Sequence, residues 1–213
     1  MTPDSPDIVL LFTRYPRPGQ CKTRLIPALG PDGAAALHRE MTERILTRLA
    51  ALTDRHPYRL EIHYDGASPA EMASWLGESH QYRQQAAGDI GCRMRDAIRG
   101  HQGRMQRLLL IGSDCPDLSA DLLRDAFAAL RTHDLVLGPA FDGGYYLIGV
   151  HDQSTALVCQ TLFQDVPWGT DTVFAITQER AQRHQLRCHT LTRLHDIDTP
   201  EDLGYFHYHP HPQ

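Results

Sequence analysis

Short apolar runs alternate along this chain with longer stretches in which apolar residues recur at helical spacing. Residues 8–13 (IVLLFT) and 108–111 (LLLI) are too short for helices and are followed by polar turns, as expected of strands buried on both faces. Between them, residues 34–52 have a helical period, with apolar residues at Leu37, Met41, Ile45, Leu49 and Leu52. Strands that alternate with helices predict an α/β domain with a mainly parallel sheet.

The rest of the chain continues this alternation. We expect further strands at residues 59–64, 135–137, 145–150 and 187–191, and further helices at residues 69–76, 90–98, 153–163 and 171–184. Ser119 is placed to cap one more helix, and Thr199 followed by Pro200 to begin a final short one. In parallel sheets, ligands bind outside the carboxyl ends of the strands. The polar clusters that follow these strands are therefore expected to meet at one edge of the sheet.

Length and composition narrow the class of protein. With 213 residues, 41% of them hydrophobic, the chain can form one large domain, which we expect at residues 1–206, followed by a solvated His/Pro-rich tail at 207–213. A net charge of −5 gives no reason to expect nucleic acid as a partner. No stretch approaches the ~18 apolar residues of a membrane span, and the acidic start differs from a signal peptide. Five cysteines without a C-x-x-C pair predict reduced thiols in a cytoplasmic protein. The oligomeric state stays open.

The first candidate site is the turn-rich segment after the first predicted strand. Of the 21 basic residues, 20 are arginine and only one, Lys22, is lysine. Gly19 allows close backbone approach to a phosphate, Lys22 and Arg24 supply charge, and Thr23 supplies a hydroxyl. The segment is neither a Walker loop nor a Rossmann G-x-G-x-x-G. An ordinary basic loop at the sheet edge is the alternative.

Two carboxylate clusters predict a divalent cation site. Asp114 follows the strand at 108–111, and Asp196 and Asp198 form a D-x-D pair near the end of the chain. Mg²⁺ is typically held by one or two carboxylates together with phosphate oxygens, and Mn²⁺ would serve equally here. The alternative for these clusters is capping of the turns and helices that follow them.

Three further segments are candidates for binding the ligand. Residues 138–146 contain Asp142, Gly143 and Gly144 between two predicted strands, and residues 165–170 combine Trp168, Gly169 and Thr170 as an acceptor-binding loop does. Asp89 lies at the start of the helix at 90–98, whose N-terminus is expected to face the same ligand. The alternatives are a tight strand connection for the first segment and a surface turn for the second. No histidine has a metal-ligand spacing, so none is assigned a catalytic role.

Taken together, these segments resemble the nucleotide-diphospho-sugar transferase superfamily. More narrowly, the chain resembles the DUF2064 family, also labelled radical-SAM/selenodomain-associated transferase 1 or arsenosugar-biosynthesis glycosyltransferase. The matching pieces cover nearly the whole chain and read FTRYPRPGQCKTRL, GDIGCRM, IGSDCPDL, GPAFDGGYYLIG, VPWGT and DIDTPEDL. The resemblance implies a Rossmann-like three-layer α/β/α sandwich of the glycosyltransferase A type, with a mostly parallel mixed sheet.

The resemblance also implies roles for the residues. K-T-R-L is similar to the K-S-R-L of phospholactate guanylyltransferases, so the first loop would hold the phosphates of a nucleotide. The nucleotide-binding residues would be Arg14, Gly19, Lys22, Thr23, Arg24 and Asp89. The catalytic residues would be Lys22, Arg24 and Asp114. The metal ligands would be Asp114, Asp196 and Asp198. The sugar or acceptor pocket would contain Asp142, Gly143, Gly144, Trp168, Gly169 and Thr170.

The implied function is a metal-dependent transferase that moves a sugar from a nucleotide-diphospho-sugar to a small acceptor. One departure keeps an alternative open, because S-D-C-P stands after the central strand where many glycosyltransferases have D-x-D. The alternative is a nucleotidyltransferase that couples a nucleoside triphosphate to a phosphorylated small molecule and releases pyrophosphate. A second alternative is a non-catalytic nucleotide-binding protein. Both reactions rest on charge neutralisation and positioning, so one set of residues would support either.

Overall fold

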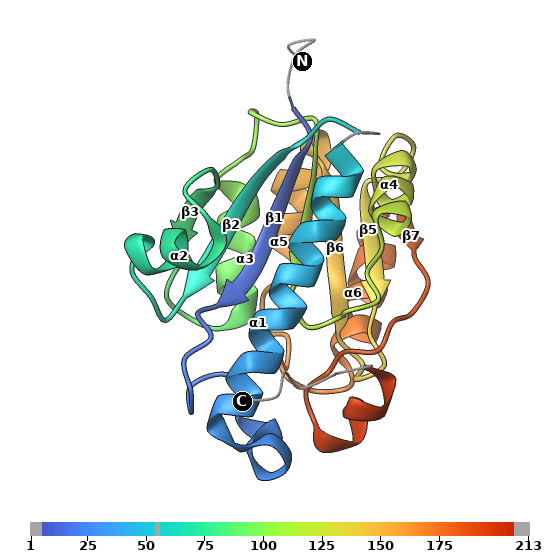
Figure 1. Ribbon diagram of the computed structural model, residues 1–213. Helices are drawn as coiled ribbons and strands as arrows, with labels where there is room; N and C mark the ends of the chain where they lie inside the picture. Colours follow the sequence, from blue (N-terminus) through green and yellow to red (C-terminus); the bar gives the residue numbers. More distant parts are fainter. Residues whose placement is uncertain (1–5, 54–55, 207–213) are drawn as a thin grey trace.

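The computed structural model describes residues 6–53 and 56–206, so the tail expected at 207–213 lies outside the described residues. A seven-stranded sheet lies between two layers of helices (Figure 1). Its strands are β1 Ile8–Arg14, β2 Arg59–Asp65, β3 Gln81–Gln84, β4 Arg107–Gly112, β5 Leu135–Pro139, β6 Tyr145–His151 and β7 Cys188–Thr190. The α-helices are α1 Ile26–Thr53, α2 Pro69–Leu76, α3 Ile90–Arg99, α4 Ala120–Ala129, α5 Thr155–Thr161 and α6 Val173–Arg183. Short 3₁₀ helices are η1 Thr23–Leu25, η2 Asp152–Ser154 and η3 Pro200–Tyr205.

The strands follow the order β3-β2-β1-β4-β6-β5-β7. All neighbouring strands are parallel except that β6 runs antiparallel to both β4 and β5. The mostly parallel mixed sheet of the predicted α/β/α sandwich is therefore confirmed.

Apolar side chains on both faces of the sheet form the core. On one face α1 and α4 cover the sheet, and Ile45 and Phe127 pack there against strand residues such as Leu109. On the other face lie α3, α5 and α6, where Ile98 and Val158 pack against a second set of strand residues. Burial on both faces explains why the central strands read as continuous apolar runs in the sequence.

Three elements differ from the sequence-based expectation. Strand β3 was not predicted, because this edge strand is polar and largely exposed and has no apolar pattern. Helix α1 starts earlier than expected, at Ile26, but it is interrupted at Gly30, which has a φ of 68°. The continuous part of the helix begins at Pro31, a residue that is favoured at the first position of a helix. The final helix after Thr199 is a 3₁₀ helix, and both the amide and the hydroxyl of Thr199 donate to the carboxylate of Asp202.

The parallel register brings the carboxyl ends of β1, β2 and β4 to one edge of the sheet. Arg14 is paired with Asp65 across β1 and β2, and Phe12 with Gly112 across β1 and β4. Within residues 6–53 and 56–206, no helix combines the length and the apolar character needed to cross a membrane.

Candidate active site

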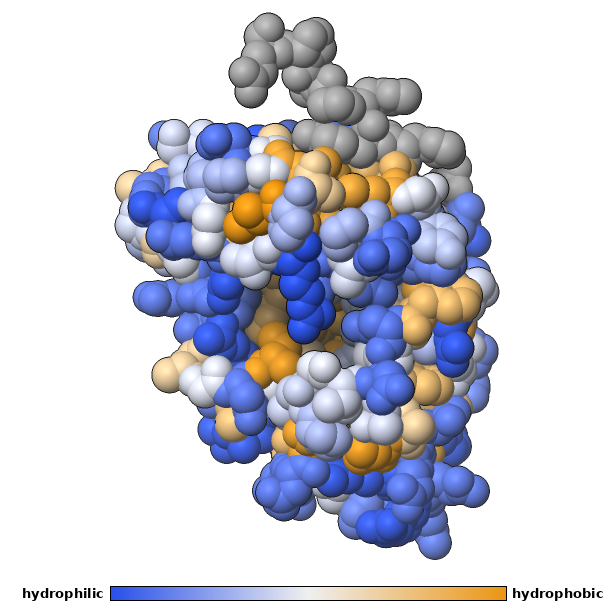
Figure 2. Space-filling view, turned by 90° about the horizontal axis from the view of Figure 1, so that it is seen from below, coloured by the Kyte–Doolittle hydropathy of each residue, from blue (hydrophilic) through white to orange (hydrophobic). Residues whose placement is uncertain are grey.

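A cleft with two lobes lies at this edge of the sheet. One cavity of about 330 Å³ extends toward β2 and a second of about 290 Å³ extends toward β5; we call them the β2-side lobe and the β5-side lobe. Figure 2, which views the molecule from this end, shows a hollow with an apolar interior and a mostly hydrophilic rim. The residues that line both lobes are Ile90, Met94, Gly112, Asp114, Tyr145 and Tyr146. The lobes are therefore two parts of one site that meet at the end of β4.

Gly112 forms the floor where the two lobes meet. A Cβ added to this residue would have no heavy atom within 4 Å, so the space above its backbone is open. This open space lies where β4 ends, just before the turn that contains Asp114. Gly112 is one of the residues that a ligand extending from one lobe to the other would pass.

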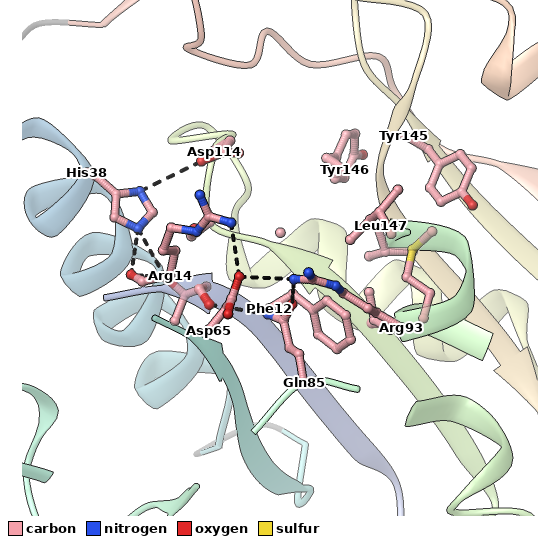
Figure 3. Close-up of a pocket in the computed structure, with 16 residues that line it drawn as sticks. Phe12, Arg14, His38, Asp65, Gln85, Arg93, Asp114, Tyr145, Tyr146 and Leu147 are labelled. Atoms are coloured by element: carbon pink, nitrogen blue, oxygen red, sulfur yellow. Dashed lines mark hydrogen bonds and ion pairs between the residues drawn. The ribbon is translucent and has the colours of Figure 1, made fainter. Parts of the chain in front are cut away.

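The wall of the β2-side lobe is a charged network between the ends of β1 and β2. Asp65 accepts hydrogen bonds from Arg14 Nη2 at 2.9 Å and from Arg93 Nη1 at 3.0 Å (Figure 3). Burial raises the pKa of Asp65, but the hydrogen bonds from the two guanidinium groups outweigh it and hold the pKa below its ordinary value. Arg93 also donates to the side-chain oxygen of Gln85. The network fixes two guanidinium groups at the edge of the cavity.

His38, on α1, joins this network to the carboxylate of Asp114. Its Nε2 lies 2.8 Å from the carbonyl oxygen of Arg14, and because a carbonyl only accepts, Nε2 is assigned the proton. Its Nδ1 is buried without a hydrogen bond and faces Asp114 Oδ1 at 3.9 Å. Burial lowers the pKa of His38 by more than the Asp114 carboxylate raises it. The ring is therefore neutral at neutral pH, and its unprotonated Nδ1 lies on the side of Asp114.

The unique lysine lies behind the two carboxylates that the sequence predicts as metal ligands. Lys22 Nζ is 2.9 Å from Asp114 Oδ1 and 3.5 Å from Asp198 Oδ1. Only 5% of the Lys22 side chain is exposed, against 49% for that of Asp114. Burial disfavours both charges, but their attraction outweighs it, so the pKa of Lys22 is raised and that of Asp114 is lowered. Arg24 Nη1 holds the other oxygen of Asp198 at 2.8 Å.

The β5-side lobe is built from the other predicted pocket segments. The amide of Gly144 donates to the Asp142 carboxylate at 2.8 Å. Gly143 has a φ of 88°, and a Cβ there would overlap the backbone of Asp171. Close approach of two chain segments therefore explains this glycine without any ligand.

Trp168 forms another wall of the β5-side lobe, which Gly169 and Thr170 also line. Its indole lies so close to Gly91 at the start of α3 that a Cβ on that glycine would overlap the ring. The two predicted segments GDIGCRM and VPWGT, far apart in sequence, are therefore packed against each other.

Asp196 differs from the other carboxylates in its electrostatics. Its pKa is raised to about 6, first by burial and then by the nearby charge of Asp142. It lines the β5-side lobe together with Asp198. The carboxylates on this side of the cleft therefore outnumber the two cations, Lys22 and Arg24, that pair with them. A bound cation would stabilise this excess of negative charge.

The carboxylates fit a divalent cation that also binds substrate. Among the residues that the structure describes, no group of three or more His, Cys, Asp or Glu side chains could hold a metal ion by itself. Asp114 and Asp198 nevertheless converge on the same ammonium group, and the Asp114 side chain is half-exposed to the cleft. One or two carboxylates completed by phosphate oxygens and water are the usual environment of Mg²⁺. The donor set therefore fits a metal that arrives with a nucleotide and does not fit a preformed protein cage.

Several predicted phosphate-binding residues lie outside the cavities described here. Gly19 supplies a turn with φ 76°, Thr23 is exposed at the start of η1, and Asp89 caps α3 by accepting from the amide of Cys92 at 2.7 Å. Arg24 lines a third cavity of about 300 Å³ beside the β5-side lobe, together with Asp196 and other residues.

The structure adds residues that were not predicted. Asp65 directly follows a predicted strand, so the rule applied to Asp114 could also have identified it. His38 and Thr42 are polar residues four apart on the buried face of α1, which is a weaker signal. Gln85 follows β3 and had no signal, since that strand was not predicted.

Comparisons with known proteins agree with this architecture. The model of DUF2064, described as uncharacterized proteins conserved in bacteria, matches residues 48–170. A solved structure from Desulfovibrio desulfuricans G20, provisionally described as a nucleotide-diphospho-sugar transferase, is 35% identical. The match covers 92% of this chain and 84% of that one, with a TM-score of 0.84. No curated protein sequence matches the chain.

More distant structures share the fold alone. A CMP:2-keto-3-deoxy-manno-octonic acid synthetase complexed with CTP is 10% identical, with a TM-score of 0.60 over 94% of this chain and 96% of that one. Rv0371C of Mycobacterium tuberculosis H37Rv, in complex with manganese, is 14% identical, with a TM-score of 0.57 over 94% of this chain and 97% of that one. The family match over more than half of the chain and the 35% identical structure lead to one conclusion: the chain belongs to the DUF2064 family.

Proposed function

We propose that this protein is a metal-dependent transferase that moves a sugar from a nucleotide-diphospho-sugar to a small acceptor. The observation that carries the proposal is the two-lobed cleft, whose lobes share Gly112 and Asp114 at the carboxyl edge of the sheet. A transfer reaction needs two adjoining binding sites that meet at the reacting atoms. The description of the 35% identical D. desulfuricans protein supports the same class of reaction.

The nucleoside is assigned to the β2-side lobe and the sugar with its acceptor to the β5-side lobe. The first lobe has the Arg14 and Arg93 guanidinium groups on its wall, fixed by Asp65. The second has hydroxyl, carboxylate and indole groups, which suit a polyhydroxylated ligand; they belong to Asp142, Trp168 and Thr170. The diphosphate would then lie over Gly112, where the open backbone leaves room for it. Phosphate contacts by Gly19, Thr23 and Asp89 stay predictions from the sequence.

Asp114 and Asp198 would hold the metal, Mg²⁺ or Mn²⁺, with Asp196 as a further ligand. When bound, the metal neutralises the negative charge that the departing nucleoside diphosphate acquires. Arg24, whose guanidinium is largely exposed, adds a second positive charge on the same side. In the reaction, the acceptor oxygen bonds to the anomeric carbon and the bond from that carbon to the diphosphate oxygen breaks.

A nucleotidyltransferase is the second candidate, and one observation favours it. The turn after β4 contains a single cleft-lining carboxylate, Asp114, where a D-x-D pair would be expected of many glycosyltransferases. In that reaction an acceptor phosphate attacks the α-phosphorus and pyrophosphate leaves.

The cytoplasmic location stays a prediction from the sequence.

Product analysis separates the candidates. The protein is incubated with Mn²⁺, a panel of small acceptors, and either nucleotide sugars or nucleoside triphosphates, and phosphorus NMR identifies the released product. Nucleoside diphosphate from nucleotide sugars is expected, and Asp114→Asn should abolish it. Pyrophosphate from triphosphates alone would replace glycosyl transfer by nucleotidyl transfer. Nucleotide binding without turnover of any acceptor would favour the non-catalytic alternative.

A further inference from the structure

The ammonium group of Lys22 is surrounded by acceptors of the protein itself. An ammonium carries three protons, and Nζ has three acceptors around it: the carbonyl oxygen of Ile197 at 2.6 Å, Asp114 Oδ1 at 2.9 Å and Asp198 Oδ1 at 3.5 Å. The side chain is 95% buried, and Lys22 is not among the residues that line the three cavities described above. A phosphate could reach Nζ only after these contacts had been broken.

The backbone is bent to place this side chain inward. Lys22 has a φ of 48° and a ψ of 43°, a left-handed conformation that few residues other than glycine adopt. Such a conformation persists where the surrounding contacts determine it. Here it separates the turn after Gly19 from η1, whose residue Leu25 donates its amide to the Lys22 carbonyl at 2.9 Å. The strained residue is thus the one that sends its side chain behind the two carboxylates.

The frame that holds the carboxylates does not depend on Lys22. The amide of Ile197 donates to the carbonyl of Asp114 at 2.9 Å, which joins the turn after β4 directly to the segment before η3. Asp198 also has Arg24 as a partner. A variant without the ammonium should therefore keep the fold, but one oxygen of Asp114 would remain buried without a counter-charge.

We propose that Lys22 is a positioning residue: its ammonium is the resident counter-cation of Asp114 and Asp198, and it competes with the divalent metal for these carboxylates instead of binding the substrate's phosphates. The proposal rests on the proposed function in so far as the carboxylates bind a metal. It assigns Lys22 a different role from the phosphate contact predicted from the sequence. It also gives a physical reason for one lysine among twenty arginines, because a compact ammonium directs its donors from one atom toward three surrounding acceptors, whereas a guanidinium spreads its donors over a planar fork.

The direct test measures Mn²⁺ affinity without nucleotide, by the electron paramagnetic resonance signal of free Mn²⁺. Lys22→Met removes the competing charge and should bind Mn²⁺ at least about tenfold more tightly than the wild type, ~1.4 kcal/mol. Lys22→Arg keeps the charge and should stay within about threefold of the wild type. Arg17→Met is the matched control, because Arg17 lies in the same loop but pairs with Glu71, outside the carboxylate site. It should leave Mn²⁺ affinity unchanged.

Nucleotide affinity at saturating Mn²⁺ distinguishes the two roles of Lys22. We expect Lys22→Met to bind GDP, UDP or CTP, whichever the wild type binds best, within about threefold of wild-type affinity. Nucleotide binding weakened more than about tenfold, with Mn²⁺ affinity not increased, would overturn the proposal and make Lys22 a phosphate ligand. If neither the wild type nor any variant binds Mn²⁺ or nucleotide, both the proposed function and the competition with metal fail.

The counter-cation role has a test that needs no metal. In urea denaturation with a chelator present, Lys22→Met should lower the unfolding midpoint. Adding Asp114→Asn to that variant should restore most of the loss, because the uncompensated buried charge is removed. No restoration would refute the counter-cation role even if nucleotides bind.

Discussion

Filling the floor of the cleft at Gly112 should block ligand binding and leave the fold intact. Gly112 ends β4, and no heavy atom lies within 4 Å of the position that a Cβ would take. A Cβ there meets no neighbour, so we expect Gly112→Val not to destabilise the protein. Replacing a strand glycine by a residue with a side chain favours the folded state by about 0.5–1 kcal/mol, so the melting temperature should stay constant or rise slightly.

The effect on binding should be large because both lobes share Gly112. The two methyl groups of valine would stand where a ligand passes from the cavity of about 330 Å³ to that of about 290 Å³. We expect nucleotide affinity to fall at least about tenfold, which corresponds to ~1.4 kcal/mol. Isothermal titration calorimetry with Mn²⁺ and the nucleotide that best stabilises the wild type measures this loss.

Two variants control for the substitution itself. Gly112→Ala should lose less affinity than Gly112→Val, since it fills less of the cleft. Gly100→Ala, at the end of α3, places its Cβ at van der Waals distance from the helix and should leave binding unchanged. Full nucleotide affinity in Gly112→Val would refute the assignment of the nucleotide to this cleft. A large loss of stability would refute the claim that the space above Gly112 is open.

Three further predictions test other parts of the molecule. Gly91→Ala puts a methyl group into the indole of Trp168, so it should cost about 1–3 kcal/mol in urea denaturation and shift the tryptophan emission. Asp196→Asn should raise the melting temperature near pH 8, because the folded state raises the pKa of Asp196 to about 6 and so disfavours its ionised form. This gain should shrink as the pH falls through 6 and vanish below the ordinary value of 3.8, where both states are protonated. Arg107→Met leaves the buried Asp7 carboxylate without its two-point partner, and we expect a loss of about 3–5 kcal/mol in urea denaturation.

Each of these predictions has an outcome that contradicts it. Unchanged tryptophan emission in Gly91→Ala would mean that the indole does not lie against α3. A melting-temperature gain for Asp196→Asn that is equal at acidic and alkaline pH would show that the charge of Asp196 is not disfavoured. For Arg107→Met, the exposed Arg124→Met is the control, with an expected change within about 0.5 kcal/mol. Equal losses in the two arginine variants would contradict the role of burial.

The central strands could be predicted because a strand buried on both faces has an uninterrupted run of apolar residues. Residues 8–13 and 108–111 are such runs, and they lie within β1 and β4. The apolar run of β6 does not by itself predict the direction of the strand, because it fits a parallel and an antiparallel neighbour equally well. Its orientation follows from the short connection from β5, which returns the chain beside the strand it has just left.

The site could be predicted where its residues directly follow such strands. Asp114 lies at the end of β4 and faces both lobes, as its place in the sequence indicated. The inward direction of the Lys22 side chain could not be predicted, because it depends on one left-handed residue and on a carbonyl 175 residues away. The contact of His38 with Asp114 likewise depends on the packing of α1 against the sheet.

The proposed function requires that the two-lobed cleft binds a nucleotide through Asp114. Differential scanning fluorimetry of the wild type and Asp114→Asn, with Mn²⁺ and a panel of nucleotide sugars, nucleoside diphosphates and triphosphates, tests it most directly. We expect that at least one nucleotide raises the melting temperature of the wild type and that Asp114→Asn loses this stabilisation. No stabilisation by any nucleotide, or equal stabilisation of both proteins, would contradict it.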